Sequence, residues 1–469
     1  MFTPQQIAEI VKGRILKGYD ARVARVMHDS RLIEPGDLFI AIKGERTDGH
    51  AFLAQSFSRG ACGAIISDET SMPGKARNLI LVDDVIVALQ ALAAAWRSQM
   101  SATFVGVTGT CGKTSTRSLL YHLLEGRMSV YSAPGNYNTE IGLPLALLAM
   151  PQEAQVGLFE LGASGPGEIA PLASLLAPSI GVITLAGRGH LTGFGSVEAV
   201  AQEKWDLVRA LPSHGKALVN VDSPPLAALA ATYTGNMTTV GVQNGDLRGK
   251  TSFSEGGVVV DVQTPHLHLE TRLLGMHNAT NILLAVAVAL KLGMPAQEIE
   301  ERVATFSPFP HRLNLFPVPF GYILDDSYNA NPESTRAAIE TLAGLKLPTK
   351  KRAFVFGDML DLGERSPRFH DEALELAIKL GIDPIFPVGD LATQAARRSA
   401  STSSFIFCKR ESLVRCIRAH LSGGKTILLV KGSLAVGLTH VAEQLSRKEG
   451  TARIPESSGS DPMQEKKES

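Results

Sequence analysis

The stretch Thr103-Phe104-Val105-Gly106-Val107-Thr108-Gly109-Thr110-Cys111-Gly112-Lys113-Thr114 decides the fold. The apolar residues before Thr108 predict a buried strand, and the leucines between Leu119 and Leu124 share one face of a helix predicted after Thr114. A strand, a glycine-rich turn and a helix in this order form a loop whose backbone N–H groups face phosphate oxygens. The general pattern G-x-x-x-x-G-K-[ST] fails at its first position, where Val107 stands. The loop therefore predicts nucleotide binding, with an ordinary glycine turn as the alternative.

Two side chains of this loop have expected roles. Lys113 is expected to reach the β- and γ-phosphates, and Thr114 to bind Mg²⁺ through its hydroxyl. Cys111 resembles a reactive thiol, but a spectator side chain is the favoured interpretation. A phosphate loop also needs a carboxylate at the end of a neighbouring strand to hold the metal. Glu160 ends the apolar run from Val156 and has this position, although a solvated acid at a strand end is equally compatible.

Length and composition predict an α/β protein of several domains. The 469 residues exceed what one core usually organises, and 44% hydrophobic with 20% charged residues is a globular mixture. Apolar β-rich runs alternate with helical patterns along the chain. We expect a small N-terminal α/β domain at 1–100, a central mixed-sheet domain with the phosphate loop at 101–308, and a C-terminal Rossmann-like domain at 309–448. The Ser-, Pro- and charge-rich tail 449–469 is expected to be disordered.

The charge balance argues against a nucleic-acid-binding or membrane-binding protein, and the cysteine spacing indicates the redox state of the thiols. Lys+Arg and Asp+Glu both number 46, which removes a whole-chain electrostatic case for nucleic acid or an anionic membrane. Cys62, Cys111, Cys408 and Cys416 contain no C-x-x-C pair, so free thiols in a reducing compartment are expected. The uncharged stretch 169–186 approaches membrane-spanning length, but its prolines and glycine predict a short helix and a strand. A cytoplasmic protein without membrane insertion is expected.

Other polar residues follow predicted strands. His190 lies in a glycine-rich loop, and Lys204 lies on a helix predicted to begin near Ser196, although a structural histidine and a solvated lysine are common. The segment Asp325–Pro332 directly follows a strand of the third domain, where ligand sites of α/β proteins form. An Asx-rich turn that caps the next helix is also compatible with it. Lys431-Gly432-Ser433 likewise follows a strand and is a candidate anion site.

Together these motifs resemble the Mur ligase family, and within it the branch that adds a D-alanyl-D-alanine dipeptide. The resemblance runs from about Asp29 to Lys431, and its most specific element is the segment from Asp325 to Pro332. The supporting matches are Asp29-Ser30-Arg31, Lys43 to His50, Asn136 to Gly142, Gly275 to Asn281 and Gly357-Asp358-Met359. The resemblance implies a monomeric, three-domain ligase that uses ATP and Mg²⁺ in cytoplasmic peptidoglycan precursor synthesis. Its substrates would be UDP-N-acetylmuramoyl-tripeptide and D-alanyl-D-alanine, joined through an acyl phosphate.

The resemblance also implies roles for individual residues. The implied catalytic residues are Lys113, Glu160, His190 and Lys204. The implied ATP-binding residues are Thr108, Gly109, Thr110, Cys111, Gly112, Lys113, Thr114, Asn281, Arg312 and Asp326. The implied metal ligands are Thr114, Glu160, His190 and, once carbamylated, Lys204. The implied substrate-binding residues are Asp29, Ser30, Arg31, Lys43, Thr47, Asp48, His50, Asn138, Thr139, Asn329 and Asn331.

Departures from the family pattern leave alternatives open. Thr139 stands where the family usually has a second asparagine, and Leu434 and Val436 stand where it usually has arginine and methionine. The third residue of the accepted tripeptide is therefore left open. A related ligase that adds another amino acid, or a γ-glutamyl unit to folate, is a second hypothesis, which the segment Asp326–Pro332 disfavours. A nucleotide-binding module without ligation is a third, and the joint presence of the four implied catalytic residues disfavours it.

Overall fold

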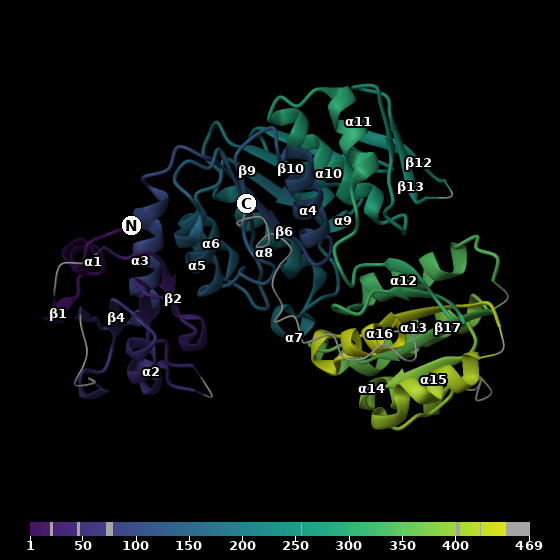
Figure 1. Cartoon of the computed structure of the whole chain (residues 1–469). Helices are drawn as coiled ribbons and strands as arrows, with labels where there is room; N and C mark the ends of the chain where they lie inside the picture. Colours follow the sequence, from purple (N-terminus) through teal and green to yellow (C-terminus); the bar gives the residue numbers. More distant parts are fainter. Residues whose placement is uncertain are drawn as a thin grey trace.

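The computed structural model describes residues 1–18, 22–44, 47–71, 78–254, 256–349, 351–399, 404–422 and 424–446. It contains three sheets, each built from one continuous part of the chain and covered by helices (Figure 1). This is the expected α/β class: a small N-terminal domain, a central domain with the phosphate loop in a mixed sheet, and a Rossmann-like C-terminal domain. The boundaries at 100 and 308 stay predictions. The tail expected to be disordered, 449–469, lies outside the described residues.

The N-terminal domain has a five-stranded sheet in the order β1-β5-β4-β3-β2. Its elements are α1 Pro4–Val11, β1 Arg14–Lys17, β2 Val26–Met27, β3 Leu38–Ile40, α2 Leu53–Ser58, β4 Gly63–Ile66, β5 Leu79–Leu81 and α3 Val85–Arg97. The apolar runs Leu38–Ile42, Ala64–Ser67 and Leu79–Val82 predict three strands, and β3, β4 and β5 form there. The sequence did not predict β1, whose residues are mostly exposed and which runs antiparallel to β5 at the sheet edge.

The central domain has a nine-stranded mixed sheet in the order β14-β13-β12-β11-β10-β9-β6-β8-β7. Its strands are β6 Thr103–Thr108, β7 Val130–Ser132, β8 Val156–Glu160, β9 Ile180–Ile183, β10 Lys216–Asn220, β11 Met237–Gly241, β12 Leu247–Phe253, β13 Val258–Val262 and β14 Leu267–Glu270. Its helices are α4 Lys113–Leu124, α5 Gly142–Ala149, α6 Ile169–Leu176, α7 Leu191–Phe194, α8 Val197–Arg209, α9 Pro224–Ala230, α10 Asn278–Lys291 and α11 Ala296–Thr305. Strands β8 and β9 both pair in parallel with β6, so their carboxyl ends meet beside the phosphate loop.

The C-terminal domain has a five-stranded sheet in the order β15-β16-β19-β17-β18. Its strands are β15 Asn314–Val318, β16 Gly321–Asp325, β17 Lys351–Gly357, β18 Ile385–Val388 and β19 Thr426–Lys431. Its helices are α12 Pro332–Gly344, α13 Ser366–Lys379, α14 Asp390–Arg398, α15 Leu413–Leu421 and α16 Leu438–Ser446. The sequence predicts a parallel sheet with strands at Tyr322–Leu324, Ala353–Phe356, Ile385–Val388 and Ile427–Val430. Strands β16, β17, β18 and β19 form there and are parallel. The additional strand, β15, is antiparallel and lies at the edge, where Pro317 removes no inner ladder bond.

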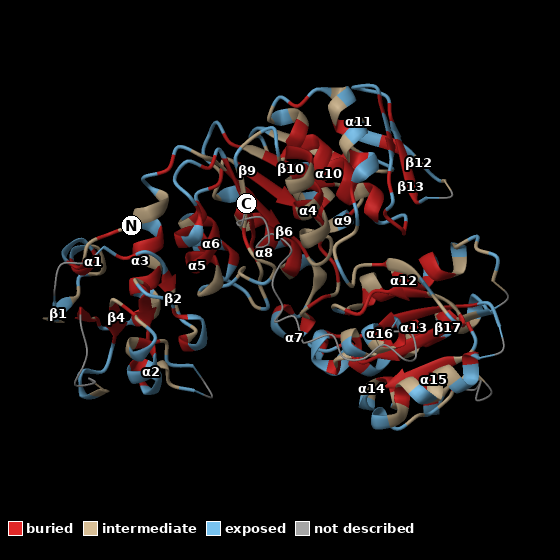
Figure 2. Ribbon diagram, viewed as in Figure 1, coloured by how far each residue is buried: buried red, intermediate tan, exposed pale blue. Residues whose placement is uncertain are grey.

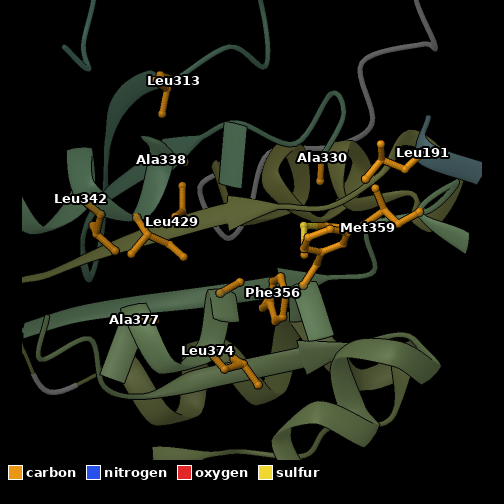
Figure 3. Close-up of a cluster of buried hydrophobic side chains, with 14 of the residues drawn as sticks. Leu191, Leu313, Ala330, Ala338, Leu342, Phe356, Met359, Leu374, Ala377 and Leu429 are labelled. Carbon is orange, nitrogen blue, oxygen red and sulfur yellow. The ribbon is translucent and has the colours of Figure 1, made fainter. Parts of the chain in front are cut away.

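The contacts between the N-terminal and central domains are more extensive than those between the central and C-terminal domains. Helix α3 packs against α5 and α6, and one continuous apolar core joins the N-terminal and central domains. Figure 2 shows the buried residues concentrated in the strands and on the inward faces of the helices. A second apolar cluster spans the central and C-terminal domains, and Figure 3 shows Leu191 of α7 near Met359 at its end.

One expectation is corrected. Cys408 and Cys416 form a disulfide bond, so the expectation of four free thiols is wrong for this pair, while Cys62 and Cys111 are free. The 3-10 helix Arg410–Ser412 and the start of α15 follow Cys408. This turn brings the two Cα atoms to 6.3 Å although no C-x-x-C spacing exists. The stretch 169–186 forms α6 and β9, as expected. Among the residues that the structure describes, no helix combines the length and apolar character needed to cross a membrane.

Candidate active site

A cavity of about 430 Å³ lies between the central and C-terminal domains. This volume falls in the range of small-molecule and cofactor sites. One wall is the phosphate loop with the start of α4, residues 110–115, and the opposite wall is the segment that follows β16. The predicted site residues that line it are Thr110, Cys111, Gly112, Lys113, Thr114, Asn138, Thr139, Glu160, His190, Asn281, Arg312, Asp326, Asn329 and Asn331. The structure thus brings residues far apart in the sequence to one cavity.

Glycine conformation and close packing shape the phosphate loop. Gly112 has a φ of +87°, and a Cβ atom there would overlap the side-chain amide of Asn281. The hydroxyl of Thr184 donates a 2.5 Å hydrogen bond to the Cys111 carbonyl from the neighbouring strand end. Lys113 Nζ folds back over the loop and donates to the Gly109 carbonyl at 2.5 Å. The loop is therefore a preformed cradle with its ammonium group on the inside, which fits a polyphosphate ligand.

Thr108 and Thr110, two threonines expected to bind ATP, also anchor the loop. Thr108 is fully buried, and its hydroxyl donates to the Leu161 carbonyl at 2.8 Å, so its side chain points away from the cavity. Thr110 lines the cavity, but its N–H donates to the Leu185 carbonyl at 2.8 Å and its hydroxyl accepts from the Gly187 N–H at 3.0 Å. These three contacts tie the phosphate loop to the segments that follow β8 and β9.

Glu160 lies where the sequence predicted, at the end of β8 and opposite Val107 of β6. The Thr114 hydroxyl donates to its Oε2 at 3.4 Å. Arg117 Nε lies 3.1 Å from its Oε1, and both side chains of this ion pair are buried. Sequence reasoning missed Arg117, although helical spacing places it one turn after Lys113 on α4. Charge rather than an aligned hydrogen bond holds this pair, because both atoms lack a hydrogen-bond partner.

His190 and Lys204 lie near the cavity, and the pKa of each is lowered, which favours the neutral form. His190 lies at the start of α7 with a φ of +56°. Burial, and then the positive charge of Lys113, lower the pKa of His190, which favours a neutral imidazole able to bind a metal. The ammonium of Lys204 is buried 3.4 Å from the Ala163 carbonyl. Burial first, and then Lys113, lower its pKa to about 7.

The donor set suits magnesium bound together with phosphate. Among the described residues, no three His, Cys, Asp or Glu side chains converge into a complete metal site. Mg²⁺ in nucleotide sites usually takes one or two protein oxygens and completes its shell with phosphate oxygens and water. The Thr114 hydroxyl and the Glu160 carboxylate are oxygen donors of this kind beside the phosphate loop.

On the opposite wall, Lys431 holds the loop after β16 in place. Its ammonium is almost wholly buried, 2.5 Å from Asp326 Oδ2 and 2.9 Å from the Asn329 carbonyl. Lys431 was predicted as part of an anion site, and in the structure its ammonium is already paired with Asp326. Arg312 is different, since its guanidinium lies 4.2 Å from the Tyr328 ring centroid and its Nε is buried without a partner. An unpaired donor in the wall fits an incoming acceptor such as a nucleotide oxygen.

The predicted asparagines occupy defined positions. The Asn281 amide donates to Asn278 Oδ1 at 2.8 Å and packs against Gly112. Asn331 caps α12, accepting from the Ser334 N–H, and its amide lies 3.1 Å from the Cys111 sulfur. This last contact crosses from the C-terminal domain to the phosphate loop.

The predicted residues of the N-terminal domain do not line this cavity. Asp29 accepts three hydrogen bonds from the Arg31 guanidinium, at 2.9, 3.2 and 2.7 Å, and this contact lowers the pKa of Asp29 to about 2. The Ser30 hydroxyl is buried and donates to Gln55 Oε1 at 2.9 Å. Arg31 itself is exposed, so it is available to a ligand while Ser30 shapes the loop.

The loop that contains Asp48 and His50 also combines a buried side chain, which orders it, with exposed residues. His50 is buried, with Nδ1 2.7 Å from Asp48 Oδ1 and Nε2 accepting from the Ser67 N–H at 3.0 Å. Lys43 forms an isolated antiparallel bridge with Asp48. Lys43 and Thr47 are exposed, whereas His50 orders the loop from within.

The chain matches three family models in succession. These are "Mur ligase family, catalytic domain" at 22–97, "Mur ligase middle domain" at 107–289, and "Mur ligase, glutamate ligase domain" at 311–434. A Bacillus subtilis protein named UDP-N-acetylmuramoyl-tripeptide--D-alanyl-D-alanine ligase is 32% identical over 450 residues, which cover 94% of this chain and 98% of the relative.

Two solved structures superpose on nearly the whole chain. A crystal structure of MurF from Acinetobacter baumannii superposes with a TM-score of 0.85 at 29% identity, covering 95% of this chain and 99% of that one. MurF ligase from Thermotoga maritima in complex with ADP gives 0.80 at 30% identity, covering 90% and 97%.

A phosphate loop that faces a separate Rossmann-like domain across a cavity is the arrangement of an ATP-using ligase. The chain belongs to the Mur ligase family. It is an enzyme of the ligase class, and within the family it is similar to the UDP-N-acetylmuramoyl-tripeptide--D-alanyl-D-alanine ligases, known as MurF.

Proposed function

We propose that this enzyme joins D-alanyl-D-alanine to UDP-N-acetylmuramoyl-tripeptide with ATP, in cytoplasmic peptidoglycan precursor synthesis. One observation carries the proposal: the phosphate loop and the Asp326–Asn331 segment line the same cavity. The full-length similarity to relatives named for this activity supports it. We also propose that the enzyme acts as a monomer.

The proposed reaction has two steps. A carboxylate oxygen of the tripeptide attacks the γ-phosphorus of ATP, the bond to the β-phosphate oxygen breaks, and ADP leaves. The neutral amine of the dipeptide then attacks the acyl carbon, and phosphate leaves with its bonding electron pair. The nitrogen gives up one proton to water, and the neutral amide forms. Lys113 and the α4 N-terminus offset the negative charge that gathers at the γ-phosphate.

Mg²⁺ would neutralise charge on the phosphates when bound. Thr114 and Glu160 would hold it, with His190 as a direct or water-mediated ligand. We propose that Lys204 becomes carbamylated and supports a second ion. Only a neutral amine reacts with carbon dioxide, and a pKa of about 7 leaves a large neutral fraction at neutral pH.

The remaining predicted residues are assigned by their place in the fold. For ATP, the main chain of the phosphate loop would bind phosphates, while Asn281, Arg312 and Asp326 would contact the rest of the nucleotide. For the dipeptide, we propose Asn329 and Asn331. For the tripeptide, we propose Asn138 and Thr139, and for its UDP-sugar end Asp29, Ser30, Arg31, Lys43, Thr47, Asp48 and His50.

Product analysis tests the function. Purified enzyme with ATP, D-alanyl-D-alanine and a panel of UDP-muramoyl-tripeptides is expected to give one dipeptide-extended product by mass spectrometry, and ADP release that requires both substrates. Equal ADP release with either substrate omitted contradicts the proposal. Amide formed instead with a single amino acid, or with a folate, favours the related-ligase hypothesis. Nucleotide binding with no amide from any precursor favours the binding module.

Removal of the loop lysine tests the ATP half of the site. Lys113→Ala is expected to lower ligation at least roughly 100-fold, because a donor aimed at charge that develops in the reaction is lost. Lys216, on β10 and hydrogen-bonded to Asn236, is outside the cavity, so Lys216→Ala is the control. Undiminished ligation by Lys113→Ala, measured as amide product per minute, rejects the assignment.

A further inference from the structure

Arg188 joins the loop before α7 to two helices of the C-terminal domain. Its Nε lies 2.8 Å from Glu333 Oε1 on α12, and its Nη1 lies 3.1 Å from Glu372 Oε2 on α13. Its guanidinium also stands 5.1 Å from the Phe369 ring centroid, within reach of a cation–π contact. Gly187 permits this approach, since a Cβ atom there would lie 2.9 Å from Glu333 Cδ.

The two glutamates depend on Arg188 to different degrees. Glu372 has a second cation, because Arg368 Nε donates to its Oε1 at 2.8 Å from the same helix. Glu333 has Arg188 on Oε1, while its Oε2 is buried without a hydrogen-bond partner. Losing Arg188 would leave the Glu333 carboxylate partly buried without a cation, which is costly in a protein interior.

The same contacts border the cavity. Glu333 lines the cavity and lies two residues after Asn331, whose amide touches the Cys111 sulfur of the phosphate loop. On the other side, Arg188 lies two residues before His190, which also lines the cavity. The ion pairs therefore set the separation between the loop that would hold ATP and the wall that would hold the dipeptide.

We propose that Arg188 is a positioning residue that fixes the C-terminal domain over the phosphate loop. This inference rests on the proposed function for its kinetic consequences, whereas its structural consequence, the separation of the two domains, is independent of it.

The experiment uses the full chain and four variants. Arg188→Gln removes the charge, Arg188→Lys keeps it, and Glu372→Gln removes one partner away from the cavity. Arg368→Gln is the matched control, because it also takes a cation from Glu372 but does not cross between domains. Small-angle scattering without ligand is expected to give a larger radius of gyration for Arg188→Gln, a smaller increase for Glu372→Gln, and the wild-type curve for Arg368→Gln.

Kinetics separate positioning from simple destabilisation. For Arg188→Gln, KM for ATP and for the dipeptide is expected to rise roughly tenfold and kcat to fall 10- to 100-fold, since reacting groups are misplaced. KM for the UDP-tripeptide is expected to stay within about twofold of wild type, as the N-terminal domain is untouched, and Arg188→Lys to recover part of the loss.

Each outcome is decisive. Scattering and kinetics of Arg188→Gln that match Arg368→Gln overturn the inference, as does an equal loss in Arg188→Lys. If Arg188→Gln does not fold, an unchanged scattering curve for Glu372→Gln overturns it. Altered scattering in an enzyme whose wild type makes no amide keeps the inference and rejects the proposed function.

Discussion

The depressed pKa of Lys204 links stability to pH. The folded-state pKa of about 7 lies below the ordinary lysine value, so between about pH 7 and pH 10 the unfolded chain binds one more proton than the folded chain. The free energy of unfolding contributed by this residue therefore rises with pH across that window, by about 1.4 kcal/mol per unit, and is constant below it. We expect Lys204→Met to remove this slope.

Urea unfolding at several pH values between 7 and 9 measures the slope, in buffer free of carbon dioxide. Trp205, the next residue on α8, reports the transition in a Trp96→Phe background. An identical pH dependence in Lys204→Met and wild type would show that the buried amine titrates normally.

At the residue scale, the sequence predicted those site residues that belong to a local motif or to the end of a strand. Lys113 and Thr114 follow from the loop, and Glu160 from its place at a strand end. Arg117 and Glu333 were not predicted as site residues, because their importance comes from contacts with Glu160 and Arg188 that only folding creates. The side chain of Thr108 belongs to the core for the same reason, since it bonds a strand end far away in sequence.

The turn that begins α4 makes a second prediction, at the scale of the element. Gly112→Ala would place a Cβ against the Asn281 amide at a left-handed φ, so the loop must open and its N–H groups must move. We expect affinity for a non-hydrolysable ATP analogue to fall at least roughly tenfold, or about 1.4 kcal/mol. Isothermal titration calorimetry measures it.

Gly135 supplies the control for that substitution. It lines the same cavity, and a Cβ there meets no atom within 4 Å. Gly135→Ala is expected to bind the analogue as wild type does. Equal affinities for the Gly112→Ala and Gly135→Ala variants would show that the glycine cradle does not limit phosphate binding.

Buried strands with continuous apolar runs were predicted, whereas the exposed edge strands β1 and β15 were not. Strands β6, β8 and β9 are continuous apolar runs because both faces of the sheet are covered. Strands β1 and β15 lie at sheet edges, where partial exposure and Pro317 weaken the pattern. The phosphate loop and the wall after β16 were predictable because both follow buried strands.

For the whole molecule, the two interfaces predict two cooperative units. Helix α3 shares a core with α5 and α6, and Trp96 Nε1 donates to the Met150 carbonyl at 3.1 Å across that boundary. The C-terminal domain is instead attached through ion pairs and the cluster around Leu191. The N-terminal and central domains should therefore unfold together, and the C-terminal domain separately.

The chain contains two tryptophans, Trp96 and Trp205, both outside the C-terminal domain, and these allow a test. In urea without nucleotide, the fluorescence midpoints of Trp96→Phe and Trp205→Phe are expected to coincide, while far-UV circular dichroism shows an additional transition. An ATP analogue with Mg²⁺, bound by residues of both units, should move the two transitions together, because ligand binding stabilises only the assembled state. Different midpoints for the two tryptophans would show that the N-terminal and central domains unfold separately, with the boundary at α3. A single dichroism transition without nucleotide would show that Arg188 and its partners already couple all three domains.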